Sequence, residues 1–423
     1  VYIHAIIAVI VLIAAETVGV WFVNTQLNIP EARMGAANWV FQATILTTIL
    51  GILQTPYNAA IVSHEHMHVY AYVGLGETFA KLFVVIGLCY YPYDRLAVWG
   101  FALFAIQLCS SLLYRFYCIK KFDNCNLRRN TWDLPLAKSM LGFTGWNMFG
   151  TIAWTLKDQG ASVLLNIFGG PTINAARGVS GQVTGAVKGL VGGFQSAVNP
   201  QLTKTYAAND TESTCRLLCK SSKFSYFLLL LISIPVILEI NFLLNIWLVE
   251  VPPYAALFTQ IVIMEALFDT LGGPMITSLM ATGRIKWYQI VVGSILLLNI
   301  PIAYLLLKLG YPIVTPLVVS LAFMIIGNAT RLLFCKNMLG LSIRTYIRTV
   351  ILPITIVSVL AFIVPYIIVS VMTEGWLRLL TCSASSVIFG VAAIYCCGFT
   401  TSERSFIINL LRNKLLRRKP SNL

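Results

Sequence analysis

Twelve apolar stretches, each long enough to cross a bilayer, follow one another along the chain and exclude an ordinary soluble domain. A transmembrane helix needs about 20 predominantly apolar residues, and only 11% of the 423 residues are charged. Apolar runs and the breakers between them predict helices at 1–22, 38–62, 70–90, 96–116, 137–166, 172–198, 224–247, 254–280, 287–307, 313–334, 349–371 and 377–397. The sequence therefore predicts an all-α polytopic membrane protein.

Lysines and arginines concentrate on alternate connections between these helices. Most of the 30 lie on one side, within 115–129, 204–223, 284–286, 331–348 and 404–419. The other side holds only Arg33, Arg95, Lys308 and Arg378. Because cytoplasmic connections carry the excess of positive charge, both ends of the chain are predicted to be cytoplasmic. The net charge of +14 then reflects topology and attraction to anionic lipid, and no nucleic-acid partner is expected.

The start of the chain and its cysteines also bear on topology. Val1 lies directly in an apolar run without a preceding basic segment, so we expect no signal peptide and expect the natural start to be missing. The ten cysteines fall in predicted spans or on the predicted cytoplasmic side, where thiols stay reduced. Neither a disulfide framework nor a metal site is expected.

A weak internal sequence repeat aligns the first three predicted helices with the seventh to ninth. Four residue pairs share a separation of 14 positions: Glu16–Pro30, Pro56–Tyr70, Glu239–Pro253 and Pro274–Tyr288. Transporters are often built from such repeats, with the substrate site between the halves. If the repeating unit has six helices, the first half of this chain lacks two.

A stripe of polar residues follows one face of the predicted helix 172–198. Its members are Arg177, Thr184, Lys188, Gln195 and Asn199, and at 3.6 residues per turn they fall within about 60° of arc. A cation inside a span costs roughly 2.5–3.5 kcal/mol on insertion scales. The stripe must therefore face water, a partner charge or a substrate. Structural ion pairs remain one interpretation, and an anion-binding wall of a central cavity is the favoured one.

Other charged residues inside predicted spans complete the candidate site. We expect Lys157 and Lys81 to join Arg177, Lys188, Thr184 and Gln195 in binding substrate. Glu77 and Lys81 also have the i, i+4 order that favours an intrahelical pair. The candidates for coupling to a H⁺ or Na⁺ gradient are five carboxylates: Glu16, Glu239, Asp158, Glu265 and Asp269.

Two further patterns are assigned structural interpretations. Gly181, Gly185, Gly189 and Gly193 recur at the four-residue spacing that lets helices approach closely, which predicts helix packing. The predicted helix 137–166 is longer than a bilayer core requires, so we expect it to be tilted or bent near Gly160.

A zinc-protease pattern, H-E-x-x-H, occurs at His64-Glu65-His66-Met67-His68. It falls in a short predicted connection with no helix to hold both histidines, and no third ligand is evident. We expect a solvated loop there. No other nucleophile arrangement stands out, and the chain is not expected to be an enzyme.

Several segments resemble the bacterial polysaccharide-biosynthesis membrane proteins related to Wzx-type O-antigen flippases. They are Gly170-Pro171-Thr172-Ile173-Asn174-Ala175-Ala176-Arg177-Gly178 and residues 16–24, 30–34, 37–42, 56–61, 145–147, 195–201 and 281–286. The resemblance implies a two-lobed, MATE-like transporter of 14 helices, of which this chain lacks the first two. It further implies a remainder of the N-lobe at 1–133, a C-lobe at 134–335, and two extra helices with a basic tail at 336–423.

The same resemblance implies a function in the bacterial inner membrane. Such proteins move undecaprenyl-pyrophosphate-linked oligosaccharide, the precursor of O-antigen, capsule or exopolysaccharide, to the periplasmic leaflet by alternating access. Membrane lipids and other polysaccharide-assembly proteins are the expected partners. The alternatives within the superfamily are a cation-coupled multidrug exporter and a lipid II flippase. A membrane glycan polymerase or glycosyltransferase is disfavoured because the chain has no large outer loop.

Overall fold

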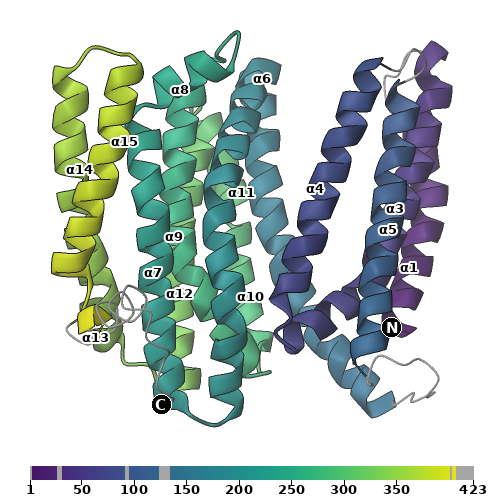
Figure 1. Cartoon of the computed structure of the whole chain (residues 1–423), viewed down its shortest axis with the longest axis horizontal. Coiled ribbons are helices and arrows are strands. Elements are labelled where there is room, and N and C mark those ends of the chain that lie inside the picture. The colour runs from purple at the N-terminus through teal and green to yellow at the C-terminus, as the bar shows by residue number, and fades with distance from the viewer. Residues whose placement is uncertain (1, 26–30, 91–94, 123–133, 401–402, 406–423) are drawn as a thin grey trace, which may run out of the picture. The chain divides into compact units, whose positions relative to one another are not determined.

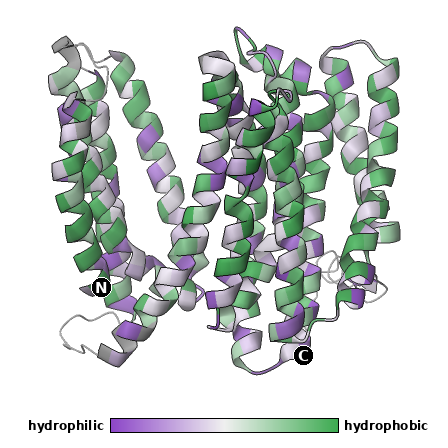
Figure 2. Cartoon of the chain, turned by 180° about the vertical axis from the view of Figure 1, so that it is seen from behind, coloured by the Kyte–Doolittle hydropathy of each residue, from purple (hydrophilic) through white to green (hydrophobic). Residues whose placement is uncertain are grey.

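The computed structural model describes residues 2–25, 31–90, 95–122, 134–400 and 403–405. Almost all of these residues are helical, and none of them lies in a β-strand. Ten of the described helices are long and apolar enough to cross a membrane, and apolar residues cover most of their length (Figure 2). The prediction of an all-α multi-pass membrane protein is confirmed. The basic connection 123–133 and the basic tail 406–423 lie outside the described residues.

The chain divides into two compact units, Val1–Lys138 and Ser139–Leu423. The first unit contains α1 (Tyr2–Ala14), a π-helical turn (Ala15–Gly19), α2 (Val20–Thr25), α3 (Glu31–Ser63), α4 (Met67–Tyr90) and α5 (Arg95–Lys121). α3 packs against α1 and α5, and α4 packs against α5 (Figure 1). These bounds lie within a few residues of the predicted helices, except that α3 starts earlier and α5 ends later.

The second unit begins within α6 (Leu134–Ala207), which consists of two helices joined at Gly170. Gly170 has φ 76° and ψ −175°, a conformation that glycine adopts far more readily than residues with a Cβ. The two halves of α6 contain the predicted spans 137–166 and 172–198. The prediction of a bend near Gly160 is wrong, because the helical backbone continues through Gly160 and breaks only at Gly170.

The remaining helices of the second unit follow the predicted order. They are α7 (Thr211–Leu238), α8 (Ile240–Trp247), α9 (Ala255–Ala281), α10 (Lys286–Leu297), α11 (Asn299–Lys308), α12 (Thr315–Leu339), α13 (Ile343–Tyr346), α14 (Leu352–Val371) and α15 (Trp376–Ala393). The predicted helix 224–247 is interrupted at Glu239, four residues after Pro235. The break lies at Glu239 itself, whose φ of −105° and ψ of 17° depart from the helical values.

The predicted helices 172–198 and 224–247 leave a hydrophilic connection at 199–223, and this prediction is wrong. α6 continues to Ala207 and α7 begins at Thr211, so only three residues separate them. Asp210 caps α7 by accepting a hydrogen bond from the Ser213 backbone N–H at 2.9 Å, and this bond lowers the pKa of its carboxyl group. Leu202 and Leu218 are fully buried in this region. Both helices therefore extend beyond their apolar spans because each buries an apolar face there.

Helices that the internal sequence repeat aligns pack against corresponding neighbours in the two units. Pro56 lies inside α3, and Pro274 lies at the matching place in α9, seven residues before the helix end in each case. As α3 packs against α1 and α5, so α9 packs against α7 and α12. The last helix of each set then contacts the one before it, α5 with α4 and α12 with α10 and α11. The same local arrangement occurs in both halves of the chain.

The C-terminal pair α14 and α15 packs against α7 (Figure 1). Two ion pairs join α7 to this C-terminal part of the chain, one at Glu239, where α7 ends, and one at Lys223, near the middle of α7. Arg378 Nε and Nη2 donate hydrogen bonds of 2.8–3.2 Å to the carboxylate oxygens of Glu239, which is fully buried. Lys223 Nζ donates to Glu403 Oε2 at 2.7 Å, and both side chains are buried. These contacts hold the two extra helices to the core of the second unit.

Glu403→Gln is expected to lower stability at neutral pH by about 1.5–3 kcal/mol, the usual contribution of a charged hydrogen bond. Burial opposes the charge of Glu403, but the bonds from Lys223 and the Thr400 backbone N–H outweigh it and lower its pKa below the ordinary 4.5. A depressed pKa stabilises the fold above the unfolded-state value and loses that effect as pH falls through the folded-state value. The difference between variant and wild type should therefore shrink in acid.

The measurement is thermal unfolding in detergent across pH 3–7. Glu212→Gln is the matched control, since the Glu212 side chain pairs with Arg216 on the exposed surface of α7. A Glu403 variant as stable as the Glu212 variant at pH 7 would contradict the role of the buried pair.

Candidate functional site

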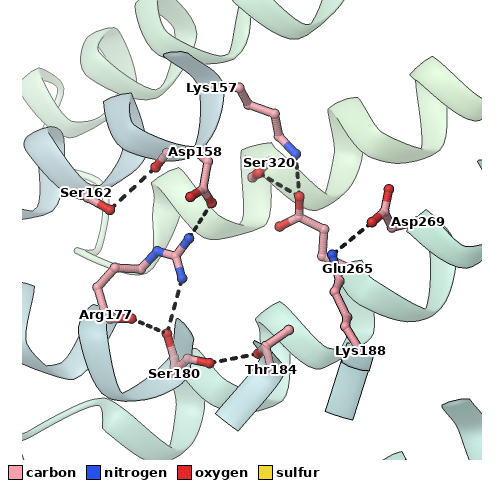
Figure 3. A network of polar contacts seen from close by, with 10 residues as sticks. All are labelled: Lys157, Asp158, Ser162, Arg177, Ser180, Thr184, Lys188, Glu265, Asp269 and Ser320. Carbon is pink, nitrogen blue, oxygen red and sulfur yellow. Dashed lines mark hydrogen bonds and ion pairs between the residues drawn. The ribbon is translucent and has the colours of Figure 1, made fainter. Parts of the chain in front are cut away.

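The most buried of the predicted cations, Lys157, points from α6 to Glu265 in the middle of α9 (Figure 3). Its ammonium donates to Glu265 Oε1, and Ser320 on α12 donates to the same oxygen at 3.1 Å. Ionisable residues within membrane helices characteristically face the bundle interior and pair in this way. The contact joins α6, α9 and α12 at one carboxylate.

Lys188 makes the neighbouring ion pair one turn further along α9. Its Nζ lies 2.8 Å from Asp269 Oδ2, and the two side chains are 36% and 26% exposed. The ring of Trp154 lies beside both lysines, with its centroid 5.0 Å from Lys157 Nζ and 5.7 Å from Lys188 Nζ. At these distances an indole face attracts a cation. The Lys188 pair is thus open to ligand, whereas the Lys157 pair is closed.

The third pair lies within α6 and spans the break at Gly170. Arg177 Nη2 is 2.6 Å from Asp158 Oδ1, with side chains 11% and 51% exposed. This contact between residues on either side of Gly170 shows that the two halves of α6 run back along each other. Arg177 Nη1 also donates to Ser180 Oγ at 3.4 Å. The Asp158 side chain is the most exposed of the six that make these ion pairs.

Two further residues of the predicted helix 172–198 stripe are engaged in packing. Thr184 is buried, and its hydroxyl donates to the Ser180 carbonyl at 2.7 Å. The Gln195 amide donates to Ser225 Oγ and to the Thr270 carbonyl, both at 3.2 Å. Gln195 therefore links α6 to α7 and α9. The fifth residue, Asn199, is half-buried, and its Oδ1 has no hydrogen-bond donor among the described residues.

Three remaining candidates have partners other than the residues of these three ion pairs. In the first unit, Lys81 pairs with Glu77 at 3.9 Å, and Glu16 accepts a hydrogen bond from Gln42 at 3.0 Å. In the second, Glu239 is fully buried against Arg378. The structure thus brings together Lys157, Lys188 and Arg177 with Glu265, Asp269 and Asp158, and does not include Glu239 in that network.

Within the second unit, no helix packs on three of the four glycines at four-residue spacing. Gly185, Gly189 and Gly193 are exposed, and a Cβ at any of them would meet no atom of the described residues within 4 Å. A spacing that permits close helix approach does not require it, because a partner surface must also be present.

The H-E-x-x-H pattern occupies a tight turn between α3 and α4. His64 lies in the turn and His68 in the first turn of α4, so the two histidines do not share a helix, as predicted. His64 stacks on Phe122 with ring centroids 4.1 Å apart, and His66 Nδ1 lies 2.7 Å from the Tyr117 hydroxyl. Within the described residues, no group of three or more metal-ligating side chains is arranged to hold an ion.

Sequence reasoning missed three residues around the network. Trp154 and Ser320 contact its charged groups, and Arg331 was counted among the residues of a connection although it lies within α12. A usable signal existed for Arg331, because it falls inside the predicted span 313–334. Trp154 and Ser320 carry no such signal, since apolar and small polar residues are common in membrane helices.

The fold and these ion pairs define a multi-pass helical membrane protein with charged residues paired inside its second unit. A scan of the chain against models of known protein families finds no match, and no curated protein matches it significantly.

Proposed function

We propose that this protein is a transporter of the flippase type, which moves undecaprenyl-pyrophosphate-linked oligosaccharide across the bacterial inner membrane by alternating access. The two helical sets with the same packing order support a transporter built from repeats. The resemblance of the segment around Arg177 to the polysaccharide flippases adds the substrate class.

One observation carries the choice of an anionic substrate. Every carboxylate of the network, Asp158, Glu265 and Asp269, has a lysine or arginine partner. A multidrug exporter of cationic compounds would be served by carboxylates without basic partners, which leave negative charge for the drug. The paired arrangement instead keeps cations ready for an anion that displaces the carboxylates.

Two of the three ion pairs, Arg177–Asp158 and Lys188–Asp269, are suited to such a displacement by substrate. A pyrophosphate presents several strong acceptor oxygens, and Arg177 offers a planar fork that binds phosphate through two parallel hydrogen bonds. Lys188 offers a compact point charge. Because both pairs are partly open to solvent, substrate oxygens can replace Asp158 and Asp269 without unfolding the helices. The closed Lys157–Glu265 pair would then serve to hold α6 against α9.

Arg177→Ala is expected to abolish outward movement of the lipid-linked oligosaccharide while membrane insertion stays intact. The measurement follows labelled lipid-linked oligosaccharide in each leaflet of cells that lack their own flippase. Arg216→Ala is the control, because Arg216 makes an exposed ion pair with Glu212 at the start of α7. Normal export by a well-expressed Arg177 variant would contradict the proposed site. If the inserted wild type moves none of several glycans but extrudes cationic drugs, the exporter alternative holds.

A further inference from the structure

One buried cation of the second unit has only neutral partners. Arg331, on α12, is 4% exposed, and its Nη1 donates to Asn328 Oδ1 at 2.8 Å. The phenol of Tyr288 lies against the same guanidinium. Its Nε is buried without any hydrogen-bond acceptor among the described residues. No ion pair joins Arg331 to a described carboxylate, unlike Lys157 and Lys223, the other cations that are buried among the described residues.

The guanidinium borders a small cavity of about 210 Å³ between α6, α9, α10 and α12. Apolar side chains such as Ile276, Met280 and Leu296 form much of its lining. Hydrogen-bonding side chains from three helices line the rest: Asn147 and Thr151 on α6, Tyr288 and Gln289 on α10, and Arg331 on α12. The Gln289 amide donates to Asn147 Oδ1 at 3.3 Å. Trp154, which touches Lys157 and Lys188 on the network side, also lines this cavity. The ion-pair network and the cavity therefore share one aromatic wall.

The lining selects the charge and size of a ligand. A buried guanidinium without a carboxylate is an expensive arrangement, and an anion in the cavity would relieve it. Drug-sized ligands occupy cavities of roughly 300–1,000 Å³, so this one suits a single small group. Arginine with convergent amide and hydroxyl donors is the donor set that recognises phosphate oxygens.

We propose that this cavity is an oxyanion site that binds a phosphate group through Arg331, with Asn147 and Gln289 as further donors. The group can come from soluble phosphate or pyrophosphate, or from the head of a polyprenyl phosphate in the membrane. The site is built entirely within the second unit. Binding of phosphate there does not depend on whether the protein moves lipid-linked glycans.

The test uses the full chain in nanodiscs of zwitterionic lipid, titrated at constant ionic strength with inorganic phosphate, pyrophosphate and, separately, incorporated polyprenyl phosphate. Binding is measured by calorimetry and by the shift of the unfolding temperature. Wild type should bind at least one probe. Arg331→Met should weaken that affinity roughly tenfold to a hundredfold and leave the ligand-free protein as stable as wild type or more stable, because it removes an unpaired buried charge.

The controls separate binding from folding. Arg284→Gln changes an exposed arginine in the turn before α10 and should bind as wild type does. Gln289→Leu keeps the charge but removes a donor, and should weaken binding even if Arg331→Met fails to insert. A response to soluble anions alone assigns a soluble ligand, and a response to polyprenyl phosphate alone assigns a lipid head. Undiminished binding by both variants, loss of ligand-free stability in Arg331→Met with unchanged binding, or no binding by wild type would overturn the site.

Discussion

Lys157→Met is expected to destabilise the protein by about 3–5 kcal/mol, the usual cost of leaving one member of a buried ion pair without its partner. The substitution keeps a side chain of similar length but leaves Glu265 with Ser320 as its remaining donor. Since Lys157 and Glu265 are contributed by α6 and α9, the loss should loosen the contact between these helices. Thermal unfolding in detergent measures the effect.

The double variant Lys157→Met/Glu265→Leu separates charge from packing. Replacing a buried pair with apolar residues of similar volume is often neutral or stabilising, so most of the lost stability should return. Lys336→Met, an exposed lysine on α12, is the control for the loss of a positive charge. A single variant as stable as this control would show that the Lys157 pair contributes little. Recovery of stability without recovery of transport would assign the pair a functional part as well.

Arg378→Leu is expected to have an effect of similar size, about 3–5 kcal/mol, located at the C-terminal helices. It removes the planar fork from Glu239, a carboxylate with no solvent exposure. Because Glu239 ends α7 and Arg378 begins α15, the uncompensated charge should release α15 from the core. Cys382 on α15 is a fully buried free thiol, so its reaction with a maleimide reports that release.

The same arginine supplies the matched control. Glu374 lies 3.8 Å from Arg378, but its side chain is 48% exposed, and exposed pairs typically contribute about 0–1 kcal/mol. Glu374→Gln should therefore leave the unfolding temperature and the labelling of Cys382 close to wild type. If Arg378→Leu labels Cys382 no faster than Glu374→Gln, the buried pair does not hold α15 in place.

The span predictions succeeded where hydropathy alone decides the outcome. The predicted helices 70–90 and 254–280 correspond to α4 and α9 within a few residues, because a helix in lipid must satisfy its backbone within one apolar segment. The predicted connection 199–223 failed because polar residues do not end a helix that still buries Leu202 and Leu218 on one face.

The sequence likewise identified some features of the candidate site and could not identify others. The cost of a charge in a span identified Lys157, Arg177 and Lys188 from the sequence as residues that need a partner. The identity of each partner could not follow from spacing, because Lys157 and Glu265 are 108 positions apart and Lys188 and Asp269 are 81. The fold-back of α6 at Gly170 and the packing of α9 select these pairs.

The sequence by itself determined that this chain forms apolar helices, in which order they occur, and which charged residues inside them need compensation, because hydropathy and the cost of burying charge are properties of each segment. Only the tertiary structure decided which charges compensate one another, that Glu239 and Arg378 join α7 to α15, and that Arg331 borders a small cavity without a described carboxylate partner. Such contacts join residues from helices far apart in the chain, and their geometry depends on how those helices pack.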